Sequence, residues 1–292
     1  MTLHRFKMEL TYDGTAYSGW QRQQGQNVRT IQGELETAIE KIVNEPVSVL
    51  GSGRTDAGVH ALYQVAAFNS ATHLAPETLV RAINASLPAD IRVFNITEVA
   101  PTFHPIHDVL RKRYRYLLTD ARPGIPFFKN NIWHLHHKLD TEAMQNAAKF
   151  LLGTHDFRSF ETQGSPRNST VRTISHISVE RCPFPECWTF PRQRLWENRN
   201  HPEKSPDAVP KSGVFPLPSL IVIEVESNGF LYNMVRSVTG TLFLFGTHHK
   251  GYTRPERMKE IVDAADRSLA GPTAPPWGLY MIDVVYNDAS LQ

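Results

Sequence analysis

The residues best suited to chemistry lie in a short glycine-rich segment, Gly51-Ser-Gly-Arg-Thr-Asp-Ala-Gly-Val-His-Ala61. Glycine permits turns that other residues avoid, so the backbone of this segment can hold Arg54 and Asp56 in fixed positions. A carboxylate held beside a cation suits a nucleophile or a general base. The same segment also fits an ordinary loop, because Asp often stabilises turns by accepting hydrogen bonds from its own backbone.

Two nucleotide-binding motifs do not fit this segment. A phosphate-binding P-loop ends in Gly-Lys-Ser/Thr, and no lysine lies between Lys41 and Lys112. A dinucleotide-binding fingerprint that begins at Gly51 requires Gly or Ala where Asp56 stands, and it leads into a helix rather than a strand. We therefore predict no nucleotide cofactor.

Arg236 is the second candidate, because it is the only Asp, Glu, Lys or Arg between Ser227 and His249. Its apolar neighbours predict a largely buried helix over 230–245. A buried guanidinium without a partner costs several kcal/mol, so the side chain either pairs with a carboxylate or extends along the helix to solvent. Asp56 is the candidate partner.

The third candidate is Arg111-Lys-Arg-Tyr-Arg-Tyr116, in which four basic residues alternate with two tyrosines. Nucleobases stack on tyrosine and phosphates pair with Arg and Lys, so this composition suits RNA. The alternation alone also predicts a strand with a solvated basic face and with Tyr114 and Tyr116 directed into the core. Both interpretations stay open.

Metal and triad chemistry have little support. The 13 histidines occur without a His-Glu-x-x-His pattern, and Cys182, Cys187 and His201 lack a clear fourth ligand. His60 lies near Asp56, but no serine nucleophile with an oxyanion-hole signature accompanies it. We predict no metal site.

Length and composition indicate the class of protein. The chain has 292 residues, which favours two lobes, and its formal net charge of +2 with 41% hydrophobic residues excludes a disordered or polybasic protein. Two cysteines are too few for a disulfide framework and favour a reducing cytoplasm. Neither residues 1–10 nor the apolar stretch 230–246 fits a signal peptide or a membrane span, so we expect a cytoplasmic protein without membrane association.

Hydrophobic periodicity predicts the elements that position these residues. In the first part the expected elements are strand 6–12, helix 31–42, strand 47–50, strand 63–69, helix 76–86 and strand 91–99. In the second part they are strand 113–119, helix 140–152, strand 171–180, strand 219–227, helix 230–245, helix 254–265 and strand 279–286. The first order, βαββαβ, is the ferredoxin-like plan, in which two helices cover one face of a sheet.

The predicted fold class is therefore α+β, with two lobes whose sheets join edge to edge and leave a crevice between them. The N-terminal lobe spans residues 1–105 and carries the Asp56 loop; the C-terminal lobe spans 106–292. The second lobe contains 8 of the 20 prolines between Pro183 and Pro218, which predicts a long loop or a partly disordered insertion at about 183–218.

Six segments, taken in order, match the motifs of one known family. They are Tyr12-Asp-Gly-Thr-Ala-Tyr-Ser-Gly-Trp-Gln-Arg-Gln23, Gly51-Ser-Gly-Arg-Thr-Asp-Ala-Gly-Val-His60, Arg113-Tyr-Arg-Tyr116, Gly153-Thr-His-Asp-Phe157, Phe230 through Met234-Val-Arg236 to Gly240, and Gly271-Pro-Thr-Ala-Pro-Pro-Trp-Gly-Leu279. Together they resemble the TruA family of tRNA pseudouridine synthases over nearly the whole chain.

The resemblance implies two ferredoxin-like (RRM-like) lobes with a joined, mainly antiparallel central sheet flanked by helices. It also implies isomerisation of uridine at positions 38, 39 and/or 40 of the tRNA anticodon arm, without a metal or organic cofactor. A homodimer with the RNA lying across both subunits is implied as well.

Four site residues follow from the resemblance. Asp56 matches the catalytic aspartate, Arg54 the arginine that helps to displace the base, Tyr114 the tyrosine that stacks at the active site, and Arg236 the helix arginine that pairs with the aspartate. The sequence does not choose whether Asp56 attacks the sugar, adds to the base or takes a proton from the ribose.

One departure from the family pattern and one alternative function remain. Ile106 stands at a position that is commonly basic in the family, which removes one expected RNA contact. The alternative function is an RNA-binding or RNA-chaperone protein that keeps the groove without catalysis. The presence of Asp56, Arg54, Tyr114 and Arg236 together favours the enzyme.

Overall fold

The computed structural model describes residues 3–23, 25, 28–122, 124, 126–162, 169–182 and 219–287. The strands are β1 (His4–Tyr12), β2 (Leu50–Gly51), β3 (His60–Ser70), β4 (Ile91–Val99), β5 (Val109–Thr119), β6 (Trp133–His134), β7 (Gly153–Asp156), β8 (Val171–Cys182), β9 (Leu220–Ser227) and β10 (Leu279–Tyr286). The α-helices of this part are α1 (Ile31–Val43), α2 (Pro76–Ser86), α3 (Thr141–Ala148), α5 (Met234–Gly246) and α6 (Arg257–Ala264). The predicted insertion at 183–218 lies outside the described residues.

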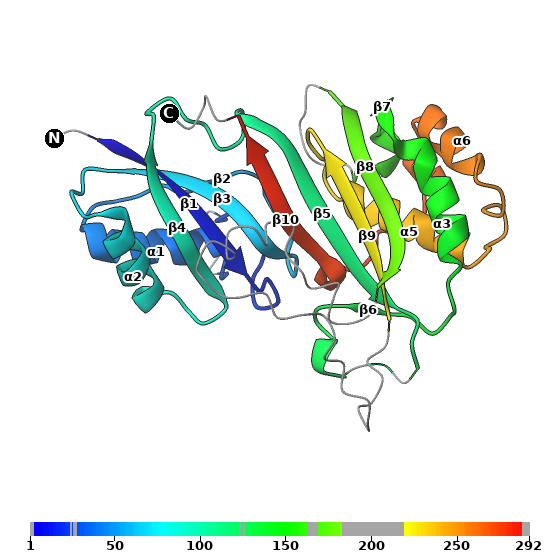
Figure 1. Ribbon diagram of the computed structural model, residues 1–292, viewed down its shortest axis with the longest axis horizontal. Coiled ribbons are helices and arrows are strands. Elements are labelled where there is room, and N and C mark those ends of the chain that lie inside the picture. The colour runs from blue at the N-terminus through cyan, green and yellow to red at the C-terminus, as the bar shows by residue number, and fades with distance from the viewer. Residues whose placement is uncertain are drawn as a thin grey trace, which may run out of the picture.

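One large, mostly antiparallel sheet organises the molecule, in the order β4-β1-β3-β10-β5-β9-β8-β7 (Figure 1). The last strand, β10, lies in the middle of this order. It pairs parallel with the start of β3, where Tyr280 lies opposite His60, and antiparallel with β5. The C-terminal strand therefore links the first strands of the chain to the later ones, and the predicted α+β class with a mainly antiparallel sheet is confirmed.

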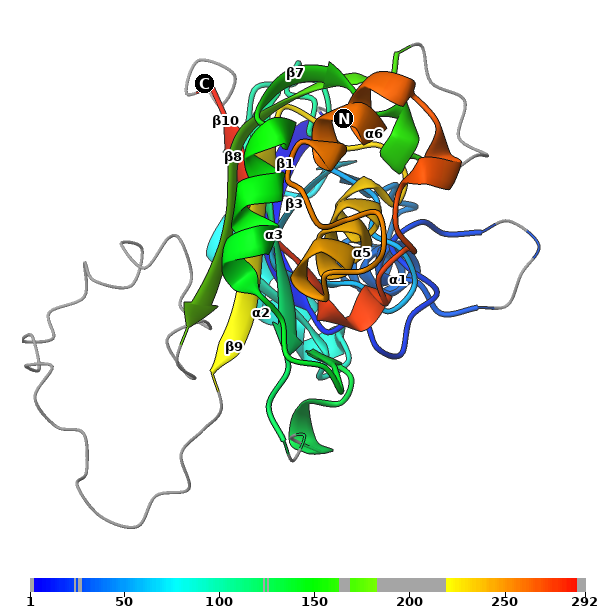
Figure 2. The ribbon, with the colours of Figure 1, turned by 90° about the vertical axis from the view of Figure 1, so that its right-hand side faces the viewer.

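The helices cover one face of the sheet. Figure 2 shows α1, α5 and α6 on the same side of the strands, and buried residues of all five described α-helices belong to one hydrophobic core with the sheet. Side chains alternate between the two faces of a strand, so Tyr116 and Leu118 reach this main core whereas Leu117 points the other way. A small second core there consists of Leu117, Ile132, Leu220, Val222, Tyr280 and Ile282.

Several predicted elements agree closely with the structure. Residues Phe6, Met8, Leu10 and Tyr12 of β1 are all buried, as the alternation predicts. Helix α1 begins after Thr30, whose hydroxyl accepts a hydrogen bond from the Gly33 N–H at 3.2 Å. Helix α2 and strand β10 have the predicted bounds.

Other predicted elements were wrong in part. Of the predicted strand 47–50 only Leu50 is in a strand, the two-residue β2, because the N–H groups of Val47 and Val49 donate to glutamate side chains of α1 instead of to a neighbouring strand. The helix expected over 140–152 is α-helical only to Ala148 and continues as a 3-10 turn. The short strands β6 and β7 were not predicted.

The helix expected over 230–245 begins only at Met234, and the helix expected over 254–265 only at Arg257. Asn233 adopts a left-handed conformation with φ of 61°, so the chain turns sharply just before α5. In the part of the chain that is described, no helix is long and apolar enough to span a bilayer.

Candidate active site

The Asp56 loop, residues 52–59, connects β2 to β3 and is fixed on both sides of Asp56. The Thr55 carbonyl accepts a hydrogen bond from the Trp20 N–H at 3.0 Å, and the Thr55 hydroxyl lies 2.8 Å from the Tyr12 hydroxyl. A Cβ on Gly14 would lie 2.0 Å from the Val59 carbonyl oxygen, so glycine lets this loop approach the end of β1 closely. The glycine-rich sequence thus produces a tightly packed loop rather than a free one.

Asp56 forms an ion pair with Arg236, which stands in the first turn of α5 and 180 positions later in the sequence. Nη1 of Arg236 lies 3.0 Å from Oδ2 of Asp56. The Asp56 side chain is 27% exposed and that of Arg236 is 16% exposed, so the pair is partly accessible to solvent. No described residue donates a hydrogen bond to the second carboxylate oxygen, which is therefore open to a ligand.

Two further acceptors orient the guanidinium. Nε of Arg236 donates to the Ala274 carbonyl at 2.8 Å, and Nη1 also donates to the Asn233 side-chain oxygen at 2.7 Å. The Asn233 amide in turn donates to the Thr162 hydroxyl at 3.0 Å. The sharp turn at Asn233 thus places an amide oxygen beside Arg236, and the predicted interpretation of Arg236 as a residue that only extends to solvent is wrong.

Residues 271–278, here called the strap, cross α5 and hold Arg236 from the other side. The strap comes so close that a Cβ on Gly240 would lie 1.7 Å from the Pro272 carbonyl oxygen. The Ala274 N–H donates to the carbonyl of Arg236 itself at 3.0 Å. The strap ends against β5, where the Tyr116 hydroxyl donates to the Pro275 carbonyl at 2.7 Å.

Tyr114 of β5 is buried on the face of the sheet that the helices cover. It packs edge-on against Phe230, with ring centroids 4.9 Å apart. Burial raises the pKa of the Tyr114 hydroxyl well above its ordinary value, and the nearby Tyr12 and Asp56 raise it further. The hydroxyl therefore stays protonated at neutral pH. Burial also raises the pKa of Tyr12 to about 12, against weaker lowering by hydrogen bonds from Thr55 and Gln64.

Arg54 differs from the other three predicted site residues. Its side chain is exposed, and it makes no hydrogen bond or ion pair with any described residue. The structure therefore brings Asp56, Arg236 and Tyr114 together and leaves Arg54 directed to solvent, two residues from Asp56. Ile106, the residue at the commonly basic position, is 44% exposed.

The arginines of β5 lie on the opposite face of the sheet from Tyr114. Arg113 lies 2.7 Å from Glu226, and Arg115 lies 2.6 Å from Glu224, both on β9. Burial opposes ionisation of Glu226, but hydrogen bonds from Ser175 and Arg113 outweigh it and lower its pKa. This face of β5 is basic in sequence and largely neutralised in the structure, so it is not an open phosphate-binding surface.

Sequence reasoning missed the position of His60, the first residue of β3. Its Nε2 lies 2.9 Å from the Asn130 carbonyl oxygen and 3.1 Å from that of Trp277, and carbonyls only accept, so Nε2 carries a proton. Its Nδ1 lies 3.0 Å from Oδ1 of Asp13, and this contact lowers the pKa of Asp13. The proximity of His60 to Asp56 in the sequence was a usable signal, and Trp277 lies in the quoted motif 271–279, whereas nothing in the sequence marked Asn130.

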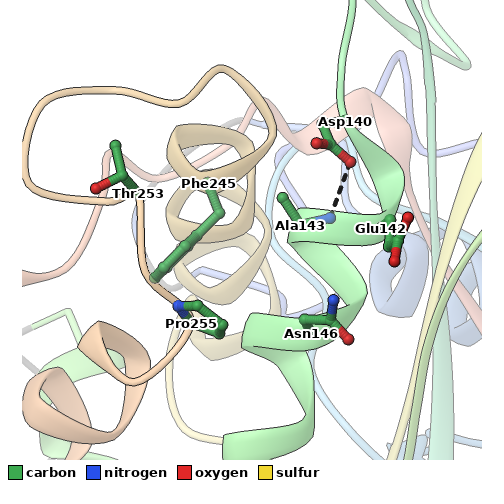
Figure 3. A pocket seen from close by; sticks show the side chains of 7 residues that line it. All are labelled: Asp140, Glu142, Ala143, Asn146, Phe245, Thr253 and Pro255. Carbon is green, nitrogen blue, oxygen red and sulfur yellow. Dashed lines mark hydrogen bonds between the residues drawn. The ribbon is translucent and has the colours of Figure 1, made fainter.

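Two hollows lie apart from Asp56. The one in Figure 3, of about 230 Å³, is bounded by α3, the end of α5 and the segment before α6. Asp140 and Glu142 give it an acidic lining, and Asp140 accepts a hydrogen bond from the Ala143 N–H as the cap of α3. This hollow would repel a phosphate. The second, of about 450 Å³, lies beside the strap.

No metal site is present among the residues that the structure describes: no three His, Cys, Asp or Glu side chains come together there. Of the weak candidate Cys182, Cys187 and His201, the last two residues lie outside the described part. The side chains that come together around Asp56 offer a carboxylate, a guanidinium and a phenol.

Comparison with known proteins agrees with this site. A sequence profile described as tRNA pseudouridine synthase matches residues 10–108 and 147–287, which include Arg54, Asp56 and Arg236 but not Tyr114. The chain is 39% identical to tRNA pseudouridine synthase A of Thermoanaerobacter sp. (strain X514), over 95% of this chain and 97% of that protein. It is 37% identical to tRNA pseudouridine synthase A 2 of Clostridium tetani, over 96% and 98% of the two chains.

A third relative, tRNA pseudouridine synthase A of Limosilactobacillus fermentum, is 38% identical over 98% of this chain and 97% of its own. These matches define an RNA-modifying enzyme class, the pseudouridine synthases, which are isomerases because uridine and pseudouridine contain the same atoms. The chain belongs to the TruA family of tRNA pseudouridine synthases.

Proposed function

We propose that this chain isomerises uridine to pseudouridine at positions 38, 39 and/or 40 of the tRNA anticodon arm, with Asp56 as its catalytic residue and without a cofactor. The observation that carries the proposal is the Asp56–Arg236 ion pair, in which one carboxylate oxygen is bound at 3.0 Å and the other is open. Family membership supplies the substrate class, and the site supplies the reacting group.

The reaction needs few groups from the protein. The bond between C1′ of the ribose and N1 of uracil breaks, the uracil turns, and C5 bonds to C1′. C5 loses a proton and N1 gains one, so no atom is added or removed. A single carboxylate that attacks the sugar, adds to the base or takes a proton from the ribose is sufficient for catalysis.

Each neighbouring residue has a role in this proposal. Arg236 orients Asp56, because its guanidinium donates a hydrogen bond to one carboxylate oxygen at 3.0 Å. Tyr114 offers a buried ring beside Asp56 on which the uracil stacks. Arg54, exposed and unpaired in the described structure, occupies the space of the base that must leave the RNA stack before reaction.

The architecture that we propose has two ferredoxin-like lobes, residues 1–105 and 106–292, joined where β10 pairs with β3 and β5. The enzyme acts as a cytoplasmic homodimer, with the tRNA anticodon arm lying across both subunits. Light scattering of the purified protein at several concentrations tests the dimer directly.

The decisive experiment for the activity uses unmodified tRNA transcripts with uridine at positions 38, 39 and 40. We expect pseudouridine at one or more of these positions after incubation, mapped at single-base resolution, with no added metal or cofactor. Transcripts that carry cytidine at all three positions serve as the control. Modification confined to another arm of the tRNA, or none, contradicts the proposal.

A further inference from the structure

The second hollow lies beside the strap and has a lining suited to RNA. It measures about 450 Å³ and is bounded by seven residues: Gly124, Pro126, Lys129, Ile132, Trp133, His134 and Trp277. The lining contains two indole rings and one ammonium group and no Asp or Glu, in contrast to the acidic hollow of Figure 3.

Direct contacts connect this hollow to the Asp56 loop. Pro276 of the strap, the residue before Trp277, lies against Gly58, where an added Cβ would come within 3.2 Å of the proline ring. His60, the residue that follows this loop, donates to the main-chain carbonyls of Asn130, which is next to Lys129, and of Trp277. His60 thus links the two segments that contribute Lys129 and Trp277 to the lining.

The two tryptophans have different surroundings. Trp133 is packed between Tyr116 and Phe243, with ring centroids 6.1 and 5.2 Å away, and forms a fixed wall. Trp277 is 38% exposed although the residues that follow it, 278–280, are buried. It lines the hollow and remains partly accessible to solvent.

Polar groups complete the lining. Lys129 is exposed and makes no ion pair with any described residue, so its charge is available to a phosphate. Nε2 of His134 is buried and has no hydrogen-bond partner in the described part of the chain. A buried polar atom without a partner is costly, and a nucleobase edge would satisfy it.

We propose that this hollow binds one unstacked nucleotide of the tRNA substrate, other than the target uridine. The base stacks on Trp277, and Lys129 pairs with the adjacent phosphate. The occupant is RNA because aromatic faces beside an unpaired cation are what a single-stranded nucleotide requires, and because Pro276 and His60 connect the strap at Trp277 to the loop that carries Asp56. This inference rests on the proposed function.

The test compares Trp277→Ala with a matched variant, Phe94→Ala. Phe94 is 39% exposed but stands on β4, at an edge of the sheet remote from the strap. We expect Trp277→Ala to raise the Kd for unmodified tRNA and the KM by about tenfold, the loss of one stacked base, with kcat changed less than about twofold. Phe94→Ala should leave both unchanged, and Trp277→Phe should retain most of the affinity.

The Kd is measured by filter binding and does not depend on turnover, so the two proposals fail separately. A wild-type protein that binds tRNA but makes no pseudouridine contradicts the proposed function. An active Trp277→Ala variant with wild-type Kd overturns the nucleotide subsite. A variant that loses kcat at unchanged Kd also overturns it, since Trp277 would then act by holding the strap in place.

Lys129→Gln independently tests the proposed phosphate contact. We expect the slope of log Kd against log salt concentration to fall by about one, the signature of one lost phosphate contact. An unchanged slope excludes a phosphate at Lys129. Thermal melting of each variant checks that the fold is retained.

Discussion

Asp56 has one carboxylate oxygen held by the protein and one that is accessible. Arg236 binds one oxygen, and the Thr55 backbone and side chain anchor the loop immediately before it. The side chain is 27% exposed, so the second oxygen can be reached by a substrate while the first stays bound to Arg236.

We predict that Asp56→Asn reduces pseudouridine formation by at least about 10²–10⁴-fold, since the amide has nearly the same shape but neither charge nor basicity. Folding and tRNA binding should be largely retained. Single-turnover assays and tRNA Kd measurements check this, with Asp263→Asn on the exposed surface of α6 as the control. An Asp56→Asn enzyme with near wild-type rate would show that another residue does the chemistry.

Arg236 is expected to matter for activity more than for stability. Arg236→Met should lower kcat by about 100-fold, because Asp56 loses the donor that orients it. It should destabilise the fold less than Arg236→Ala, since Met keeps apolar volume in the first turn of α5. Urea unfolding and rate measurements on both variants separate the two effects; full activity of Arg236→Met refutes the pairing role.

At the scale of elements, the strap and α5 must touch for the site to exist. We predict that Gly240→Ala costs about 1–3 kcal/mol or more of unfolding free energy, because its Cβ would lie 1.7 Å from the Pro272 carbonyl oxygen. Activity should fall as well, since the strap carries the Ala274 carbonyl that holds Arg236. Gly229→Ala is the control: its Cβ meets only the Arg172 side chain, at 3.4 Å.

A second element-scale prediction concerns Asp120, which follows β5 and binds Arg181 of β8 at 2.6 Å. Burial disfavours the charged carboxylate, but hydrogen bonds from Arg181 and the Leu139 N–H outweigh it, so the pKa of Asp120 falls from 3.8 to about 2. A carboxyl with a lower pKa in the folded state stabilises the protein above its unfolded pKa. This stabilisation disappears as the pH falls from about 4 to about 2.

Asp120→Asn should therefore lower the free energy of unfolding by about 2 kcal/mol at pH 7, the equivalent of this pKa difference. The difference in unfolding free energy between the wild-type protein and the variant should become smaller below about pH 4. Urea titrations at pH 7, 4 and 3 measure it, with Asp263→Asn as the surface control. If the difference in unfolding free energy does not change with pH, the charge of Asp120 does not stabilise the fold.

The sequence indicated the elements better than the junctions between them. Alternation and capping were sufficient for β1, α1 and β10, because local patterns determine those elements. The pairing of Asp56 with Arg236 was predictable because an isolated charge in an apolar helix needs a partner. The strand expected at 47–50 failed because glutamates of α1 take its hydrogen bonds, a tertiary contact that no local pattern reveals.

The site was incomplete for the same reason. The carbonyl of Ala274 orients Arg236 only once the strap crosses α5, and the Asn233 side chain does so through a left-handed backbone turn that the helical pattern did not predict. The arginines of β5 were basic in the sequence, but their partners Glu224 and Glu226 lie over 100 positions away. Charge neutralisation of this kind can be read only from the strand order.

At the scale of the whole molecule, these ion pairs decide where RNA is attracted. The net charge is only +2, so affinity for phosphates must come from local cations that have no acidic partner. Arg113 and Arg115 are each paired with a glutamate of β9 on the face away from Asp56. Arg54 is unpaired in the described structure and lies on the loop that carries Asp56.

We therefore predict that tRNA binding weakens as salt concentration rises, and that Arg54→Gln lowers the slope of log Kd against log salt by about one. Arg113→Gln should leave that slope unchanged, because the guanidinium that it removes is already neutralised by Glu226. It should instead lower the urea midpoint of unfolding, because the buried Glu226 carboxylate is left with weaker partners such as Arg111. Binding isotherms at four or more salt concentrations for both variants and the wild-type protein give the three slopes. If Arg113→Gln flattens the slope as much as Arg54→Gln does, the arginine face of β5 contacts phosphate after all, and the RNA path must include the side of the sheet that carries no helices.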